Sequence, residues 1–355
     1  MARRGAHYEE PERMSFDYTS NYNRVRSIGN RDVNEFLCEV LGPRFRKYRE
    51  DWDRTNRDRA TTEFPLYLVL EQQYRCNLRC PMCLIPYPEK RMFNVPEAVM
   101  PDDIFEKVMA EAEQWGCPSI SMNNTEEPLL NKKVFERIQR ARRAGFVDVF
   151  MNTNGVLLDA DRAERLIDSG LTRLLIGFDG HTKEVYEKVR KGANFEQVKA
   201  NVERFLEIRE KKNSLFPLVR LSFVVSEVNQ HELEAFKEYW MGRVDYLAIQ
   251  EYQMPPVQNP ELRGVALPGT TTIYDCDQPF NRMIIRPNGD VNPCCSFWAY
   301  TLNLGSVREK SVHEIWHSEG FNKIRESFRA GKDLEKTCVN CLENQPLHVE
   351  SVSDK

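Results

Sequence analysis

The sequence predicts an α/β fold: an open, partial (β/α)6 barrel followed by a small C-terminal unit made of a β-hairpin and helices. Six apolar runs of strand type alternate with stretches whose apolar residues recur every three or four positions, as in VFERIQRARRA. Such alternation is typical of a parallel sheet with right-handed crossover helices. Because the repeating stretch is shorter than the about 250 residues of a complete eightfold barrel, we expect the barrel to be open.

The predicted elements of the barrel run from about residue 64 to residue 251. Strands are expected at Leu66–Glu71, Ser119–Met122, Asp148–Asn152, Thr172–Phe178, Val219–Val225 and Tyr246–Glu251. Helices are expected at Asp102–Trp115, Lys132–Ala144, Ala160–Ser169, Asn194–Lys212 and Gln230–Met241.

We expect three units along the chain. Residues 1–62 form a charged helical extension, with a helical stretch around Asp32–Arg59 for which a packing or solvated cover is the simplest role. Residues 63–255 form the barrel. In residues 256–355, a segment rich in Pro and Gly precedes MIIRPNGDVNPCC, which predicts a hairpin, and SVHEIWHSEGFNKIRESFRAG, which predicts helices.

The composition gives no sign of nucleic-acid or membrane binding. The 355 residues carry a net charge of −4 and a charged fraction of 29%. No apolar run approaches the about 20 residues of a transmembrane helix. Since the opening MARRGAHYEEPERMSF also lacks the apolar stretch of a secretion signal, we expect a cytoplasmic protein.

The three cysteines Cys76, Cys80 and Cys83 lie directly after the first predicted strand, in the spacing C-x3-C-x2-C. A structural zinc site needs four closed ligands. A four-iron cluster held by three thiolates instead leaves one iron open to another ligand, and an open iron can perform chemistry. The spacing therefore favours an iron–sulfur cluster.

Four further cysteines near the end of the chain also indicate a metal site, and they are Cys276, Cys294, Cys338 and Cys341. Four thiolates suit a second iron–sulfur cluster or a structural zinc ion. Of the three cysteines that remain, Cys38 and Cys117 are expected to be small buried apolar side chains.

Polar segments follow the next three predicted strands: NNTEEPLLN, NTNG and GFDG. The carboxyl ends of parallel strands lie on one face of the sheet, so these segments should meet the three-cysteine loop there.

In their order and spacing, CNLRCPMC, EEPLLN, TNG and FDGHTKEVYEKVRKGANFE resemble the radical SAM superfamily, and the C-terminal cysteines resemble its SPASM/twitch subfamily. The resemblance covers roughly residues 64–345 and implies a partial TIM-like barrel. It implies that S-adenosylmethionine (SAM) chelates the open iron of a [4Fe–4S] cluster. Reduction then cleaves SAM to a 5′-deoxyadenosyl radical that takes a hydrogen atom from the substrate.

The resemblance also implies roles for residues around that cluster. The three cysteines of the loop would ligate it, and Met82 stands where the family has a hydrophobic or aromatic residue near the adenine. Glu127 stands where the family has the Glu that holds the methionine ammonium. Thr125 and Glu126 replace two common glycines, so Glu126 is an alternative for that role.

Further SAM contacts are implied on the later strands. Asp179 matches a segment that contacts the ribose, where many relatives carry Ser in place of Gly177. The guanidinium of Arg190 suits capture of the methionine carboxylate. Asn152 and Ser222 are weaker candidates on the same face.

By the same resemblance, Cys276, Cys294, Cys338 and Cys341 hold one auxiliary [4Fe–4S] cluster, with Gly289 and Cys294 forming the family's G-x4-C element. Cys295 is then a spare thiol. A fully ligated cluster suits electron transfer. The predicted reaction is therefore oxidation of a secondary alcohol of a sugar or aminocyclitol to a ketone, as in the aminocyclitol dehydrogenase type.

Three alternatives stay open: an epimerase with Cys295 or Cys117 as hydrogen donor, an enzyme that modifies ribosomal peptides, and a non-catalytic iron–sulfur or zinc protein. The expected partners are a hydroxylated small-molecule substrate and a reductant such as flavodoxin or ferredoxin.

Overall fold

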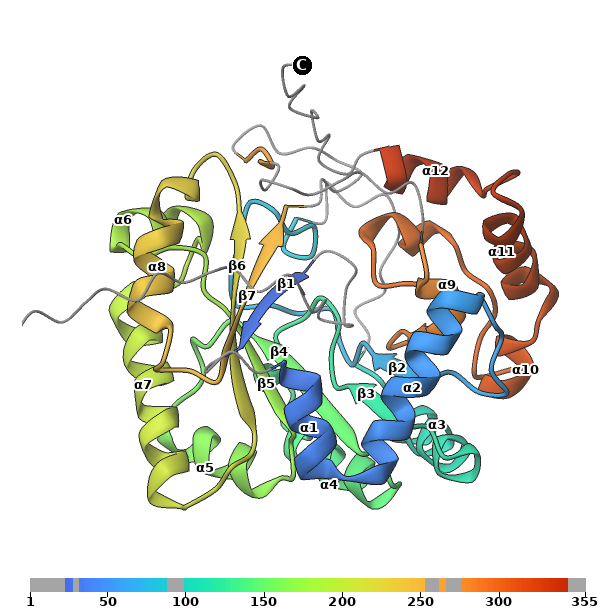
Figure 1. Ribbon diagram of the computed structural model, residues 1–355, viewed down its shortest axis with the longest axis horizontal. Coiled ribbons are helices and arrows are strands. Elements are labelled where there is room, and N and C mark those ends of the chain that lie inside the picture. Colours follow the sequence, from blue (N-terminus) through green and yellow to red (C-terminus); the bar gives the residue numbers. More distant parts are fainter. Residues whose placement is uncertain (1–22, 28–31, 88–98, 253–261, 266–275, 344–355) are drawn as a thin grey trace, which may run out of the picture.

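The computed structural model of the chain describes residues 23–27, 32–87, 99–252, 262–265 and 276–343. Its strands are β1 (Asn23–Ser27), β2 (Tyr67–Leu70), β3 (Ser119–Ser121), β4 (Asp148–Thr153), β5 (Arg173–Gly177), β6 (Leu218–Val225), β7 (Tyr246–Glu251), β8 (Arg282–Ile285) and β9 (Val291–Asn292). They form one sheet in the order β1-β7-β6-β5-β4-β3-β2-β8-β9 (Figure 1).

The predicted α/β barrel is confirmed. The six predicted strands are present as β2 to β7, and each pairs in parallel with the next. The order begins at β1 and ends at β9, so the sheet of the described residues stays open rather than closing on itself.

Six helices cover the outer face of this sheet. Four of them match the predicted helices closely in position, and α6 is a short helix that the sequence analysis missed. They are α3 (Asp102–Trp115), α4 (Val134–Arg143), α5 (Ala160–Asp168), α6 (Lys183–Val189), α7 (Phe195–Lys211) and α8 (Leu233–Trp240). The predicted helix at 230–241 begins with a short 3-10 turn, Gln230–Glu232, before α8.

The sheet has two apolar faces because successive strand residues point to opposite sides. On β4, Val149 and Met151 belong to the large outer core beneath the helices α3 to α8, whereas Phe150 belongs to an inner cluster. On β5, Leu174 and Leu175 divide in the same way. A second layer must therefore cover the inner face.

The N-terminal helices α1 (Val33–Leu41) and α2 (Pro43–Asp58) supply that layer. Figure 1 shows them on the viewer's side of the sheet, near the ends at which β2 to β5 begin. Gly42 separates the two helices with φ +80°, a conformation that favours glycine, and Pro43 starts the second helix. The helical stretch expected around Asp32–Arg59 is thus two helices that pack inside the open barrel.

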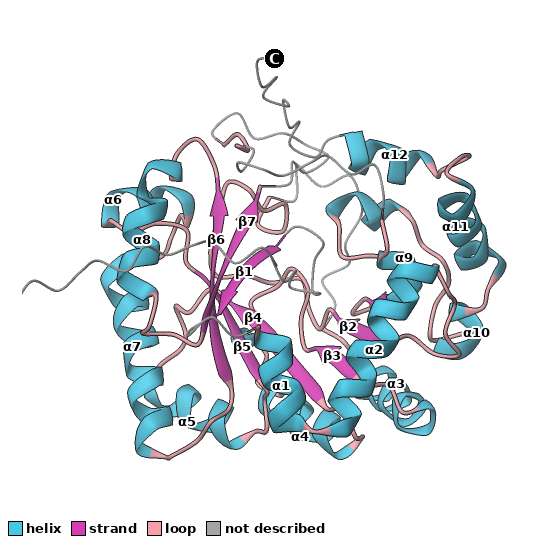
Figure 2. Ribbon diagram, in the orientation of Figure 1, coloured by secondary structure: helices cyan, strands magenta, loops and turns pink. Residues whose placement is uncertain are grey.

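The C-terminal unit continues the same sheet. β8 pairs in parallel with β2, and β9 returns antiparallel to β8, which confirms the predicted hairpin. The other helices are α9 (Gln278–Asn281), α10 (Val312–Trp316), α11 (Glu319–Ala330) and α12 (Lys336–Glu343). Figure 2 shows α10, α11 and α12 gathered at one side of the sheet, on the right of the view.

At the other edge, β1 pairs antiparallel with β7. The sequence analysis missed β1.

The Pro- and Gly-rich segment at 255–274 lies outside the described residues, apart from 262–265. In the described part of the chain, no helix combines the length and the apolar character needed to cross a bilayer.

Replacing Trp52 with Ala should lower the free energy of unfolding by about 3–5 kcal/mol, because a large buried ring leaves a cavity. Trp52 is 1% exposed and its ring lies 5.9 Å from that of Tyr48 and 6.3 Å from that of Tyr67 on β2. Urea denaturation measures the loss. Val40→Ala on α1, at a side chain 41% exposed, is the control and should cost less than about 0.5 kcal/mol. Equal losses would contradict the role of the inner cluster.

Candidate functional site

The three-cysteine loop leaves the C-terminal end of β2 and is tied to its neighbours by backbone hydrogen bonds. Arg79 donates its N–H to the carbonyl of Lys191 after α6, at 2.9 Å, and Cys83 donates to Cys80, at 3.0 Å. Glu127 donates its backbone N–H to the carbonyl of Arg75, at 3.0 Å. The loop is therefore held against the loop that follows β3 and the segment that follows α6.

The three thiols of this loop are close enough to influence one another. Burial raises the pKa of Cys76 to about 11 and that of Cys83 to about 12, and it also raises the pKa of Cys80. Negative charge on Cys80 raises the pKa of the other two further. Without a metal these thiols hold their protons at neutral pH, so loading a cluster would release protons.

The four C-terminal cysteines also converge. Cys276 precedes α9, Cys294 follows β9, and Cys338 and Cys341 lie one turn apart on α12. Burial raises the pKa of each, and charges on Cys276 and Cys341 raise that of Cys294. Ser296 Oγ lies 3.3 Å from the sulfur of Cys341.

The spacing of the sulfurs tests which metal group fits both sites. Four thiolates around one zinc ion would lie about 3.8 Å from one another, since each Zn–S bond is about 2.3 Å long. Among the described residues, which include all seven of these cysteines, no three cysteine sulfurs lie within 4.8 Å of one another. Such spacing is wider than a single tetrahedral zinc ion with four thiolates would give, and it is compatible with a larger four-iron cluster.

Glu127 lies beside the three-cysteine loop with both carboxylate oxygens engaged. Oε1 accepts hydrogen bonds from Thr153 Oγ1 (2.8 Å) and the N–H of Leu129 (3.1 Å), and Oε2 accepts from the N–H of Asn154 (2.8 Å). Asn154 in turn donates its amide to the side chain of Asn77 in the loop, at 2.8 Å. Burial raises the pKa of Glu127 to about 6, and these hydrogen bonds oppose the rise.

The two residues that replace the family's glycines make specific contacts instead. Glu126 is buried, and its carboxylate accepts hydrogen bonds from the backbone N–H groups of Gln72 (2.6 Å) and Asn124 (2.9 Å). This carboxylate therefore stabilises the loop after β3, and its partners differ from those of Glu127. Thr125 donates to Glu71 at the end of β2. Asn152, predicted on the same face, donates its backbone N–H to the side-chain oxygen of Asn123, at 2.8 Å.

Asp179 and Arg190 form an ion pair next to the loop, with Arg190 Nε 2.5 Å from Asp179 Oδ2. The other oxygen of Asp179 accepts from the N–H of Val224 on β6, at 2.7 Å. Burial alone would lower the pKa of Arg190, but negative charge on Asp179 and Cys80 raises it. The guanidinium therefore stays charged between the cysteine loop and the ends of β5 and β6.

Gly177 makes this position of Arg190 possible. A Cβ on Gly177 would lie 2.1 Å from Nη2 and 2.7 Å from Cζ of Arg190. The guanidinium of Arg190 thus occupies the space that the side chain of any larger residue at position 177 would need. Ser222 pairs with Gly177 across the two strands and is buried.

The comparisons with known proteins agree with this geometry. Residues 70–240 match the model of the radical SAM superfamily, and residues 276–342 match that of the iron–sulfur cluster-binding SPASM domain. Together the two matches span more than half of the chain. The chain belongs to the radical SAM superfamily. Its cofactors are SAM and two [4Fe–4S] clusters.

Individual relatives are distant. The tungsten-containing aldehyde ferredoxin oxidoreductase cofactor-modifying protein of Pyrococcus furiosus is 25% identical over 323 residues, which are 78% of this chain and 86% of that protein. The crystal structure of Streptococcus suis SuiB bound to S-adenosylmethionine has a TM-score of 0.62 at 15% identity, covering 84% of this chain and 74% of that one. BtrN in complex with AdoMet and 2-DOIA has a TM-score of 0.53 at 17% identity, covering 79% and 94%. These two likenesses support the shared fold.

The radical SAM core and the SPASM unit meet at a buried polar cluster that the sequence analysis missed. Tyr300, on the 3-10 helix Phe297–Thr301, donates to Glu71 and lies 2.9 Å from Thr125 Oγ1. Arg286 at the end of β8 stacks on the Tyr300 ring at 3.8 Å. Tyr300 also packs with Tyr74 next to the cysteine loop. The sequence held one sign of this cluster: Glu71, a charged residue directly after an apolar strand, which needs a polar partner if it is buried.

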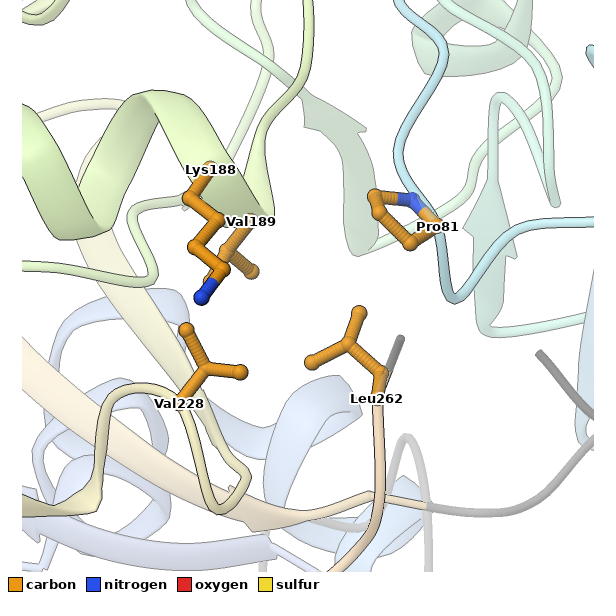
Figure 3. Close-up of a pocket in the computed structure, with 5 residues that line it drawn as sticks. All are labelled: Pro81, Lys188, Val189, Val228 and Leu262. Carbon is orange, nitrogen blue, oxygen red and sulfur yellow. The ribbon is translucent and has the colours of Figure 1, made fainter. Parts of the chain in front are cut away.

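A cavity of about 240 Å³ opens beside the three-cysteine loop (Figure 3). Its lining is mostly apolar and consists of Pro81, Lys188, Val189, Val228 and Leu262. Pro81 stands between Cys80 and Met82, whose side chain is half-buried. The cavity is thus mostly apolar, with one cation, Lys188, in its lining.

Two cysteines considered as hydrogen donors lie at the wrong end of the barrel for that role. The sulfur of Cys295 lies 3.5 Å from Gln278 Oε1 and 4.0 Å from Arg282 Nη1. Arg282 pairs with Tyr67, the first residue of β2, whereas the cysteine loop follows the last residue of that strand. Cys295 and the loop therefore lie at opposite ends of β2. Cys117 is buried and donates to the carbonyl of Pro65, also ahead of β2.

Gly177→Ala should destabilise the chain by about 1–3 kcal/mol while Arg190 is present, because the added methyl group overlaps the guanidinium. In an Arg190→Ala background the same change should cost less than about 0.5 kcal/mol. A double-mutant cycle by urea denaturation measures this coupling and removes the separate cost of leaving Asp179 unpaired. An equal cost in both backgrounds would contradict the close approach.

Glu127→Gln should flatten the pH dependence of stability between about pH 4.5 and pH 6, since the folded-state pKa of about 6 exceeds the ordinary 4.5. A raised pKa means that protonation of Glu127 stabilises the folded state. This contribution of about 2 kcal/mol is complete below pH 4.5 and is lost as the pH rises through 6. Urea denaturation of both proteins across this range measures the slope, and an unchanged slope in the variant would contradict the assignment.

Proposed function

We propose that the chain is a radical SAM oxidoreductase that converts a secondary alcohol of a sugar or aminocyclitol to a ketone, with the auxiliary cluster accepting an electron. The observation that carries this proposal is the gathering of four cysteines in the SPASM unit and of three in the core. Three thiolate ligands leave one iron of a four-iron cluster open to SAM, whereas four thiolate ligands leave no iron open to a substrate. A closed cluster is suited to electron transfer.

We assign the three-cysteine loop to the SAM-binding cluster and Cys276, Cys294, Cys338 and Cys341 to the auxiliary cluster. When bound, SAM and its cluster supply a 5′-deoxyadenosyl radical that removes a hydrogen atom from the substrate carbon. Oxidation to the ketone would also need that carbon to lose one electron, which the auxiliary cluster would accept, and its hydroxyl to lose one proton. A hydroxylated small molecule and an external reductant such as flavodoxin or ferredoxin are the partners this reaction needs.

We assign the surrounding side chains to SAM itself. The carboxylate of Glu127, oriented by Thr153 and the N–H of Asn154, would hold the methionine ammonium. Arg190 would hold the methionine carboxylate, and Asp179 orients its guanidinium. Met82, Asn152 and Ser222 are assigned to the adenosine part.

Oxidation is favoured over epimerisation by the position of the spare thiol. An epimerase needs a hydrogen donor at the substrate radical, and Cys295 contacts Gln278 and Arg282 at the start of β8 instead. A non-catalytic zinc protein is disfavoured by the spread of the sulfurs.

A second candidate is modification of a larger molecule, either a cofactor or a ribosomal peptide. The supporting observation is the 25% identity over 86% of the length of the Pyrococcus furiosus cofactor-modifying protein.

Cys294→Ala should leave reductive cleavage of SAM intact but lower ketone formation to below about a tenth of wild type, because the electron acceptor is lost. Cys295→Ala is the matched control and should retain both activities. The assay incubates anaerobically reconstituted, reduced protein with SAM and a panel of aminocyclitols in deuterated water and analyses products by mass spectrometry.

Net loss of two hydrogen atoms from the product supports the dehydrogenase. Deuterium gained at an inverted carbon would instead identify an epimerase. Failure of the wild-type protein to cleave SAM would contradict the assignment of the three-cysteine site as catalytic.

A further inference from the structure

Two histidines and a carboxylate converge at a place that neither cluster site uses. One ligand atom each from Glu63, His313 and His317 lies within 4.8 Å of the other two, and within the described residues this is the sole His/Cys/Asp/Glu group so compact. Glu63 lies in the segment between α2 and β2, and His313 lies on α10 of the SPASM unit with His317 at its end. The group therefore joins the entry to the radical SAM core to the C-terminal unit.

The spacing of the histidines suits a shared ligand. His313 and His317 are four residues apart, which brings them to one side of the helix, and their rings lie 4.6 Å apart. The ring of His313 is stacked on Trp115 of α3 at 4.2 Å and nearly parallel, at 10°. One histidine is thus oriented by packing before any ligand arrives.

The backbone of Glu63 is also fixed against α10. Trp316 Nε1 donates to the carbonyl of Thr62, at 2.7 Å, and His317 Nε2 lies 2.9 Å from the carbonyl oxygen of Glu63. A histidine that donates one ring N–H to a backbone carbonyl keeps its other nitrogen as a ligand, a common arrangement around protein-bound metals.

One ring nitrogen of the group makes no hydrogen bond to any described residue. His313 Nε2 is buried and has no hydrogen-bond partner among the described residues, and it lies 3.9 Å from Glu63 Oε2. That separation is too long for a hydrogen bond. It is close to the about 3.4 Å between a nitrogen and an oxygen bound to one tetrahedral zinc ion.

We propose that Glu63, His313 and His317 bind a divalent cation of the zinc type, which fastens the segment before β2 to α10. Two imidazoles and one carboxylate form a ligand set that zinc accepts, with water completing four-coordination at the half-exposed site. The ion stabilises the seam between the two units without taking part in the radical reaction. The proposal does not depend on the substrate.

The test uses the reconstituted holoenzyme with both iron–sulfur clusters, in metal-free buffer. Zinc chloride is titrated anaerobically by isothermal calorimetry and by thermal unfolding, while the cluster absorbance is monitored. We expect one zinc ion per chain and an upward shift of the melting temperature with zinc concentration. Glu63→Gln and His317→Gln should each weaken binding by about tenfold or more.

Matched controls separate this site from the cysteines and from misfolding. His231→Gln changes an exposed histidine outside the group and should bind zinc as the wild type does. Glu63→Gln changes an exposed side chain, so the variant should fold and keep both clusters. Absence of a zinc-dependent shift, zinc binding that persists in Glu63→Gln and His317→Gln, or loss of cluster absorbance on titration would overturn the proposal.

Discussion

The parallel pairing of β2 with both β3 and β8 is the constraint on which the rest of the structure depends. It places the strand that leads into the three-cysteine loop between the radical SAM core and the SPASM hairpin. The beginning of β2 carries Tyr67, which packs in the inner cluster with α2, and its end leads to Glu71. One short buried strand thus connects the inner cluster, the cysteine loop and the seam between the units.

The buried cluster at that seam explains how the two units can work as one enzyme. Tyr300 lies six residues after Cys294 and donates to Glu71, which lies five residues before Cys76. Burial raises the pKa of Glu71, with Tyr300 and Arg286 opposing that rise. A buried polar network of this kind holds the two units in a specific relative position.

The inner face of the open barrel illustrates a general cost of incomplete closure. A closed barrel fills its interior with its own strand side chains, whereas an open one leaves apolar residues such as Phe150 and Leu175 without cover. Here α1 covers them with Leu37, and α2 covers them with Phe45, Tyr48 and Trp52. Helix α2 is amphipathic: its aromatic residues face the sheet, whereas charged side chains such as Lys47 and Arg54 are exposed.

The sequence by itself determined the elements and ligands that local pattern encodes: six parallel strands, the crossover helices, the C-x3-C-x2-C loop and the hairpin with its turn. Strand and helix periodicity and ligand spacing act over a few residues, so short windows reveal them. Only the tertiary structure decided which distant segments meet: β1 on β7, β8 on β2, Tyr300 on Glu71, and Glu63 with the histidines of α10. It also showed that Gly177 makes room for Arg190, because the overlap depends on the path of a side chain thirteen residues further along the chain. Such contacts depend on the three-dimensional packing of whole elements, which no single window contains.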